Sequence, residues 1–165
     1  MLLRKRERLI RRLIVVEDEP LVAFDNERLL EDAGYEVVAT VDNLADAARA
    51  IAEEELHLVL TDMTLNGDGD GLDVARAAAG RSIPVLFVSG NFPAGGEGLC
   101  IGWLVKPYND KMLRSALDAI EATLQGRPEK KLPNGLSLYE QAKAGAFRMG
   151  GMAPIKGTIV PVPAR

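Results

Sequence analysis

Four groups of complementary chemistry follow short apolar runs at separate points in the chain. Glu17 and Asp18 form an acidic pair, and Asp62, Ser89 and Lys106 each follow or end a later run. Carboxylates close together repel one another unless protons or a cation intervene, and oxygen ligands suit Mg²⁺ or another divalent cation such as Mn²⁺. We therefore predict a metal site with Glu17, Asp18 and Asp62 as ligands. Asp62 is the candidate nucleophile towards a phosphoryl group, with the Lys106 ammonium and the Ser89 hydroxyl as partners for its oxygens.

These residues are far apart in the sequence, so they can act together only if the fold brings them to one edge of a sheet. Short runs rich in Val, Ile and Leu predict strands, and several are continuous, as expected for parallel strands covered by helices on both faces. The runs are Leu13–Val16, Tyr35–Val41, Leu56–Leu60, Ile83–Val88 and Ile101–Val105. Alternation with segments of helical period predicts a doubly wound α/β fold, in which ligands bind beyond the carboxyl ends of the strands.

The helical segments differ in how clearly the sequence defines them. Asn43 is a candidate N-cap for the second helix, and the last helix is predicted over Asp110–Leu124 with Gly126 ending it. The link from Ser89 to Gly102 is crowded with glycine. We therefore expect the fourth helix to be irregular or missing.

Charge is distributed unevenly along the 165 residues. Residues 1–12 carry 6 basic and 1 acidic side chains, residues 126–165 carry 7 and 2, and residues 13–125 carry 7 and 21. We predict a basic N-terminal arm over 1–12, one domain over 13–125 and a flexible Pro/Gly-rich basic tail over 126–165. The arm could contact anionic lipid or nucleic acid, remain a solvated extension, or fold back on the acidic body, as could the tail.

Composition excludes several classes of protein. The single cysteine, Cys100, cannot form an internal disulfide, and no Cys/His spacing suggests zinc. No stretch is apolar enough to predict a signal peptide or a membrane span. A cytoplasmic protein is expected.

Four motifs in this order resemble the response-regulator receiver family of two-component systems. They are Leu13-Ile14-Val15-Val16-Glu17-Asp18-Glu19-Pro20, Leu58-Val59-Leu60-Thr61-Asp62, Phe87-Val88-Ser89-Gly90 and Val105-Lys106-Pro107-Tyr108. The resemblance covers roughly residues 13–125 and implies a flavodoxin-like sheet of five parallel strands in the order 2-1-3-4-5. It also implies that Glu17 and Asp18 hold the metal and that Asp62 is the phosphoacceptor. By the same resemblance, Ser89 and Trp103 act as switch residues. Lys106 and Thr64 belong to the catalytic set.

One subgroup of the family resembles this chain further. The Phe-Val-Ser-Gly segment is similar to the Phe-Ala-Thr-Gly signature of stand-alone regulators with an irregular fourth helix. The sequence also departs from the family, because Asn66–Asp70 replaces the usual proline-containing loop and the link between Ser89 and Lys106 is short. These departures leave the phosphorylation site intact and affect the usual output surface.

The resemblance implies a switch rather than an enzyme. A sensor histidine kinase or a histidine phosphotransfer protein would donate the phosphoryl group, and protein contacts or onward phosphotransfer would carry the signal. DNA binding is not expected. The alternative from another class is an Mg²⁺-dependent phosphohydrolase with Asp62 as covalent nucleophile, although Asp62-Met63-Thr64 lacks a second carboxylate as general acid. A third possibility is a constitutive interaction domain, which the intact Asp18, Asp62 and Lys106 disfavour.

Two other features have simpler interpretations. Asn66, Asp68, Asp70 and Gly71 imitate the start of a calcium loop, but the twelfth position is Ala77 rather than glutamate. A solvated loop is therefore predicted there. His57 lies beside a strand without a partner motif, which predicts a structural or surface histidine.

Overall fold

The structure, a computed structural model, describes residues 7–91, 94–96 and 98–139. Its six-stranded sheet has the order β2-β1-β3-β4-β5-β6, and the first five strands are parallel. The strands are β1 (Arg12–Val16), β2 (Glu36–Val41), β3 (Leu58–Asp62), β4 (Val85–Ser89), β5 (Gly102–Val105) and β6 (Leu136–Leu138). The predicted doubly wound fold and its strand order are confirmed.

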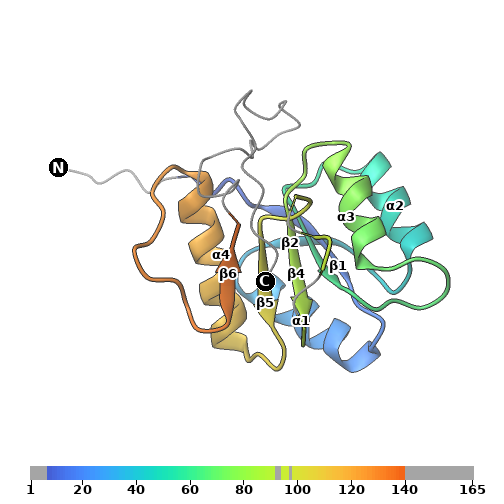
Figure 1. Ribbon diagram of the computed structural model, residues 1–165, viewed down its shortest axis with the longest axis horizontal. Helices are drawn as coiled ribbons and strands as arrows, with labels where there is room; N and C mark the ends of the chain where they lie inside the picture. The colour runs from blue at the N-terminus through green and yellow to red at the C-terminus, as the bar shows by residue number, and fades with distance from the viewer. Residues whose placement is uncertain (1–6, 92–93, 97, 140–165) are drawn as a thin grey trace.

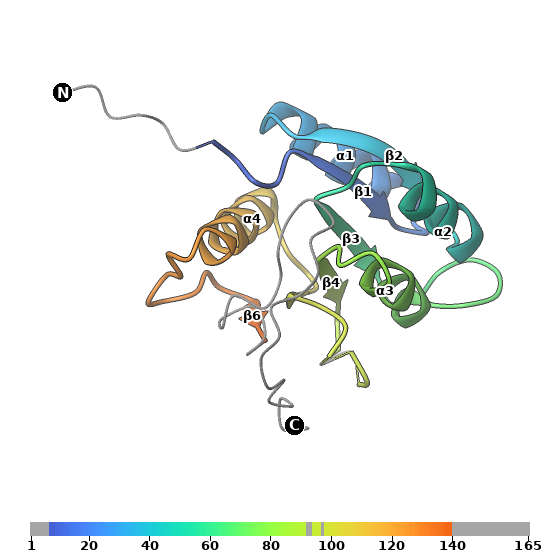
Figure 2. The same ribbon diagram turned by 90° about the horizontal axis from the view of Figure 1, so that it is seen from above.

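Within the described residues, four helices cover the two faces of this sheet (Figures 1 and 2). They are α1 (Pro20–Asp32), α2 (Leu44–Glu53), α3 (Gly71–Ala79) and α4 (Asp110–Leu124). Alternate strand residues point to opposite faces: Leu13 and Val15 of β1 pack in a cluster with α1 and α4, whereas Ile14 and Val16 pack with α2 and α3. Burial on both faces explains why the strands read as continuous apolar runs.

Local signals in the sequence set several helix boundaries. The Asn43 side chain accepts a hydrogen bond from the Asp46 N–H at the start of α2, as predicted, and Asn109 caps α4 through the Met112 N–H. Gly126 follows α4 with a φ of 75°, a conformation that glycine adopts without strain. Among described residues between Ser89 and Gly102 there is no helix, in agreement with the predicted irregular or missing fourth helix.

The sheet has one strand more than the five predicted. β6 lies antiparallel beside β5 and comes from the segment 126–165 that we expected to be a flexible tail. Three residues give too little periodicity to identify a strand, and its position depends on contacts with β5 rather than on local sequence. Residues 140–165 of the predicted tail, and residues 1–6 of the predicted arm, lie outside the described residues.

The described part of the predicted N-terminal arm packs on the domain. The Glu121 carboxylate of α4 accepts hydrogen bonds from the backbone N–H groups of Leu9, at 2.9 and 3.1 Å, and Ile10, at 2.8 Å. The Ile10 side chain is fully buried. His57, which is also buried, accepts hydrogen bonds at Nδ1 from two further backbone N–H groups where this segment enters β1, and is therefore a structural histidine.

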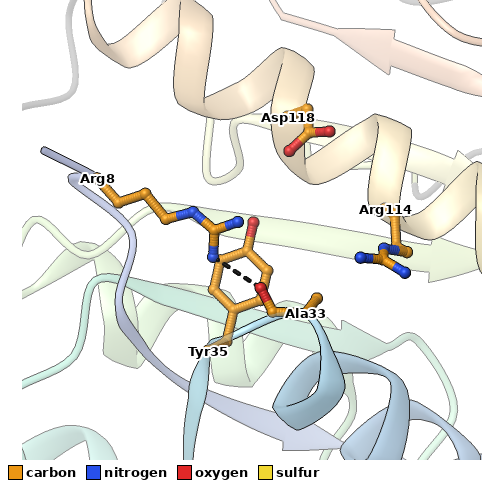
Figure 3. Close-up of a pocket in the computed structure, with 5 residues that line it drawn as sticks. All are labelled: Arg8, Ala33, Tyr35, Arg114 and Asp118. Carbon is orange, nitrogen blue, oxygen red and sulfur yellow. Dashed lines mark hydrogen bonds between the residues drawn. The ribbon is translucent and has the colours of Figure 1, made fainter. Parts of the chain in front are cut away.

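A cation–π contact adds to this attachment (Figure 3). The Arg8 guanidinium lies 4.6 Å from the centre of the Tyr35 ring and donates a hydrogen bond to the Ala33 carbonyl. Burial raises the pKa of Tyr35, with the nearby Arg8 charge acting in the opposite direction. Arg114 and Asp118 of α4 complete the wall of this small pocket.

No helix in the described part of the chain combines the length and apolar character needed to cross a bilayer.

Replacing Glu121 with alanine should destabilise the fold by roughly 1–3 kcal/mol, because the Leu9 and Ile10 N–H groups lose a charged acceptor. Urea denaturation followed by circular dichroism measures the change. Glu129→Ala, which alters an exposed glutamate beyond α4, is the matched control. Equal stabilities of the two variants would show that the N-terminal segment contributes nothing through Glu121.

Candidate metal centre

The candidate site lies at the carboxyl edge of the parallel strands. Glu17 and Asp18 follow β1, Asp62 ends β3, Ser89 ends β4, and Lys106 follows β5. Because β3 lies between β1 and β4, the ends of three neighbouring strands meet at this edge, with Lys106 arriving from the next strand. Parallel pairing therefore brings together residues that are up to 89 positions apart in the chain.

Three carboxylates form a compact cluster. One oxygen from each of Glu17, Asp18 and Asp62 lies within 4.8 Å of the other two. Glu17 is almost completely buried, and Asp18 and Asp62 are partly exposed, so solvent reaches the cluster from one side. The donor set fits a hard divalent cation, because Mg²⁺ prefers carboxylate oxygens and keeps several waters in its coordination shell.

Lys106 supplies the positive charge at this site. Its Nζ lies 2.6 Å from Asp62 Oδ2 and 3.4 Å from Glu17 Oε2. Burial acts against the charge of the ammonium, but the hydrogen bond to Asp62 and the attraction of both carboxylates raise its pKa overall. Lys106 thus contacts two of the three carboxylates in the cluster.

Glu17 is the most deeply buried of the three carboxylates. Burial raises its pKa from 4.5 to about 7; the attraction of Lys106 opposes the rise, and repulsion by Asp62 adds to it. The Glu17 N–H donates to the Val41 carbonyl, which fixes the backbone at the end of β1.

The backbone that follows β3 orients Asp62. Its Oδ1 accepts a hydrogen bond from the Met63 N–H at 2.6 Å and a longer one of 3.4 Å from the Thr64 N–H. Thr64 thus contacts Asp62 through its backbone, while its side chain is exposed. With Oδ2 bound to Lys106, both Asp62 oxygens have fixed partners.

Gly71 is a positioning residue that the sequence reasoning missed. A Cβ at this position would lie 2.2 Å from the Asp62 carbonyl oxygen, so only glycine lets the start of α3 approach the end of β3 this closely. Asp70 caps the same helix, and Asp73 completes the capping box. This loop is therefore a helix entry rather than a calcium loop.

Asn26 is a second residue that sequence reasoning missed. It is buried on α1 and exchanges hydrogen bonds with the hydroxyl of Tyr108, two residues after Lys106. Burial raises the pKa of Tyr108, while its hydrogen bond with Asn26 acts to lower it. The available signal was a polar residue on the inner face of an otherwise apolar helix stripe.

The two predicted switch residues meet through the backbone of Ser89. The Ser89 carbonyl accepts hydrogen bonds from the Trp103 indole at 3.0 Å and from the Lys106 N–H at 2.9 Å. The Ser89 hydroxyl oxygen accepts a long hydrogen bond of 3.4 Å from the Asn91 N–H. Ser89 therefore connects the site to β5 through its backbone carbonyl.

Comparisons with known proteins identify one family. Residues 13–118 match the family described as response regulator receiver domain. The phyllosphere-induced regulator PhyR of Methylorubrum extorquens is 30% identical over 79 residues, which cover 47% of this chain and 30% of that protein. The transcriptional regulatory protein PdtaR of Mycobacterium tuberculosis is 29% identical over 117 residues, covering 66% and 55%. The matched part thus spans less than two thirds of either relative.

A solved structure supports the same comparison. The receiver domain of the sensor histidine kinase PA1611 from Pseudomonas aeruginosa is 26% identical, with a TM-score of 0.55 and coverage of 66% of this chain and 94% of that chain. That structure has a magnesium ion coordinated in its active-site cleft.

Affinity for Mg²⁺ should rise with pH up to about 7 and then level off, because a proton on Glu17 competes with the cation. The rise is expected to approach about tenfold per pH unit at most. Isothermal titration calorimetry between about pH 5.5 and pH 8 measures it. Glu17→Gln should flatten the profile and the exposed Glu19→Gln should not; an unchanged slope in Glu17→Gln would contradict the assignment.

Proposed function

Since this chain belongs to the response regulator receiver domain family, we propose that it is a signalling switch that accepts a phosphoryl group on Asp62. The donor is the phosphohistidine of a sensor histidine kinase or of a histidine phosphotransfer protein. The observation that carries the proposal is the contact of 2.6 Å between the Lys106 ammonium and Asp62, beside a cluster of three carboxylates.

The proposed reaction transfers a phosphoryl group between two side chains. An Asp62 carboxylate oxygen attacks phosphorus, a P–O bond forms, and the P–N bond to the donor imidazole breaks with its electron pair returning to nitrogen. A divalent cation held by Glu17, Asp18 and Asp62 would neutralise charge between the carboxylate and the incoming group. Lys106 binds and neutralises a phosphoryl oxygen from the side facing β5.

Backbone N–H groups fix the orientation of the Asp62 side chain, so it needs little rearrangement during the reaction. The Met63 and Thr64 N–H groups hold the carboxylate in one orientation before the donor arrives. Preorganised donors of this kind lower the barrier because they need not be rearranged during the reaction. We propose that the Ser89 hydroxyl then donates to a phosphoryl oxygen and that Trp103 responds, since the Ser89 carbonyl holds its indole.

The output is proposed to be a protein contact or onward phosphotransfer. In the described part of the chain, α4 is followed by β6 rather than by a helix-turn-helix, so no DNA-binding element supports a transcription factor. The irregular link after Ser89 fits the stand-alone subgroup with a Phe-Ala-Thr-Gly-like motif. The hydrolase alternative requires a general acid, and Thr64 occupies the position two residues after Asp62 where a second carboxylate would stand.

Acetyl phosphate with Mg²⁺ should label the wild-type protein once per chain, because a small acyl phosphate can replace the protein donor. Intact-mass spectrometry measures the label. Asp62→Ala should remain unlabelled, and the exposed loop variant Asp68→Ala should label as wild type. Labelling of Asp62→Ala would refute the phosphoacceptor assignment, and sustained rapid release of phosphate from varied phosphoesters would favour the hydrolase.

Lys106→Met keeps the length of the side chain and removes its charge. It should slow labelling by acetyl phosphate by about 10²-fold, since one electrostatic partner of the phosphoryl oxygens is lost. Stopped time courses analysed by mass give the rate constant. Lys111→Met, at an exposed position on α4, should retain the wild-type rate. An undiminished rate in Lys106→Met would remove Lys106 from the mechanism.

A further inference from the structure

β6 closes an edge of the sheet that the five parallel strands leave open. It lies beside β5 (Figure 1) and pairs with it over three residues. The Val105 N–H donates to the Gly135 carbonyl, and the Tyr139 N–H donates to the Ile101 carbonyl. A Cβ on Gly102 would lie 2.6 Å from the Ser137 carbonyl oxygen. Glycine at this position therefore permits the close approach of β6.

The segment Leu136–Tyr139 also packs against both faces of the sheet. Leu136 and Leu138 are buried in the cluster that contains α1 and α4. Tyr139 is buried in the opposite cluster, which also includes Cys100 and the partly buried Trp103. Tyr139 thus packs on the face that α2 and α3 cover, and the link between β4 and β5 has no helix among its described residues.

β5 connects this segment directly to the candidate site. Val105 pairs with Ser89 on one side and donates to Gly135 on the other, and Lys106 is the next residue. Trp103 pairs in register with Ser137 of β6 while its indole donates to the Ser89 carbonyl. Ser89 and Lys106 are therefore joined by direct contacts to the strand on which β6 rests.

We propose that Leu136–Tyr139, which we term the strap, docks on β5 in the unphosphorylated protein and is loosened by phosphorylation of Asp62. This inference rests on the proposed function. In this proposal, a shift of the Ser89 backbone towards the phosphoryl group weakens the hydrogen bond from the Trp103 indole to the Ser89 carbonyl, and the same shift moves Val105 away from Gly135. Because coupling between two equilibria is reciprocal, strap docking also opposes phosphorylation, and undocking favours it. The strap thereby links the state of Asp62 to the chain segment that follows Tyr139.

Amide hydrogen exchange in the wild-type protein tests the proposal. Phosphorylation by acetyl phosphate and Mg²⁺ should accelerate exchange of the Val105 and Tyr139 amides roughly tenfold, a usual size for coupling between sites. The Leu60 amide in central β3 should be unaffected, and Asp62→Ala treated identically should show no change. Intact mass of the same sample reports the label. A labelled protein with unchanged exchange overturns the strap alone, whereas absence of the label overturns the proposed function and the strap with it.

Gly102→Ala tests the reciprocal effect. The added methyl group should unseat β6 and raise several-fold the fraction labelled at a limiting acetyl phosphate concentration. Gly80→Ala is the matched control, because a Cβ there makes only ordinary contacts at the end of α3. Faster strap exchange in Gly102→Ala with an unchanged labelled fraction would contradict the coupling. Should Gly102→Ala fail to fold, the exchange experiment on the wild-type protein still decides.

Discussion

The structure depends on an imbalance of charge at one edge of the sheet. Glu17, Asp18 and Asp62 converge there, and Lys106 is the cation that contacts two of them. With all three carboxylates ionised, the group has two negative charges in excess, which a divalent cation would balance. Burial of Glu17 makes this balance sensitive to protons, because its pKa of about 7 lets a proton replace part of the missing positive charge.

The rest of the fold maintains this convergence. Parallel strands covered by helices on both faces bring the three carboxylates and the lysine to one edge, and Gly71 lets α3 begin directly against the end of β3. Lys106 follows β5 at the margin of the parallel sheet, where the link from β4 has no helix among its described residues. The additional strand β6 and buried Tyr139 support that margin. β5 therefore has the candidate site at its carboxyl end, through Lys106, and β6 along its outer edge.

The sequence predicted those strands and site residues that a local sequence pattern marks. Continuous apolar runs identified the five parallel strands, and the residues after them identified the acidic cluster and Lys106. The attachment of the N-terminal segment to Glu121, 112 residues away from Leu9, has no such signal, because a carboxylate that accepts backbone N–H groups resembles any helix-surface glutamate. β6 was missed because three residues show no reliable period, and Gly71 because its role depends on a backbone distance.

Anomalous diffraction from crystals grown with Mn²⁺ tests the central claim most directly, because it locates the cation without assuming which residues bind it. We expect a single strong peak within coordination distance of carboxylate oxygens of both Asp18 and Asp62, at roughly 2.0–2.6 Å. A fully occupied Mn²⁺ peak elsewhere, with none between these carboxylates, would contradict it.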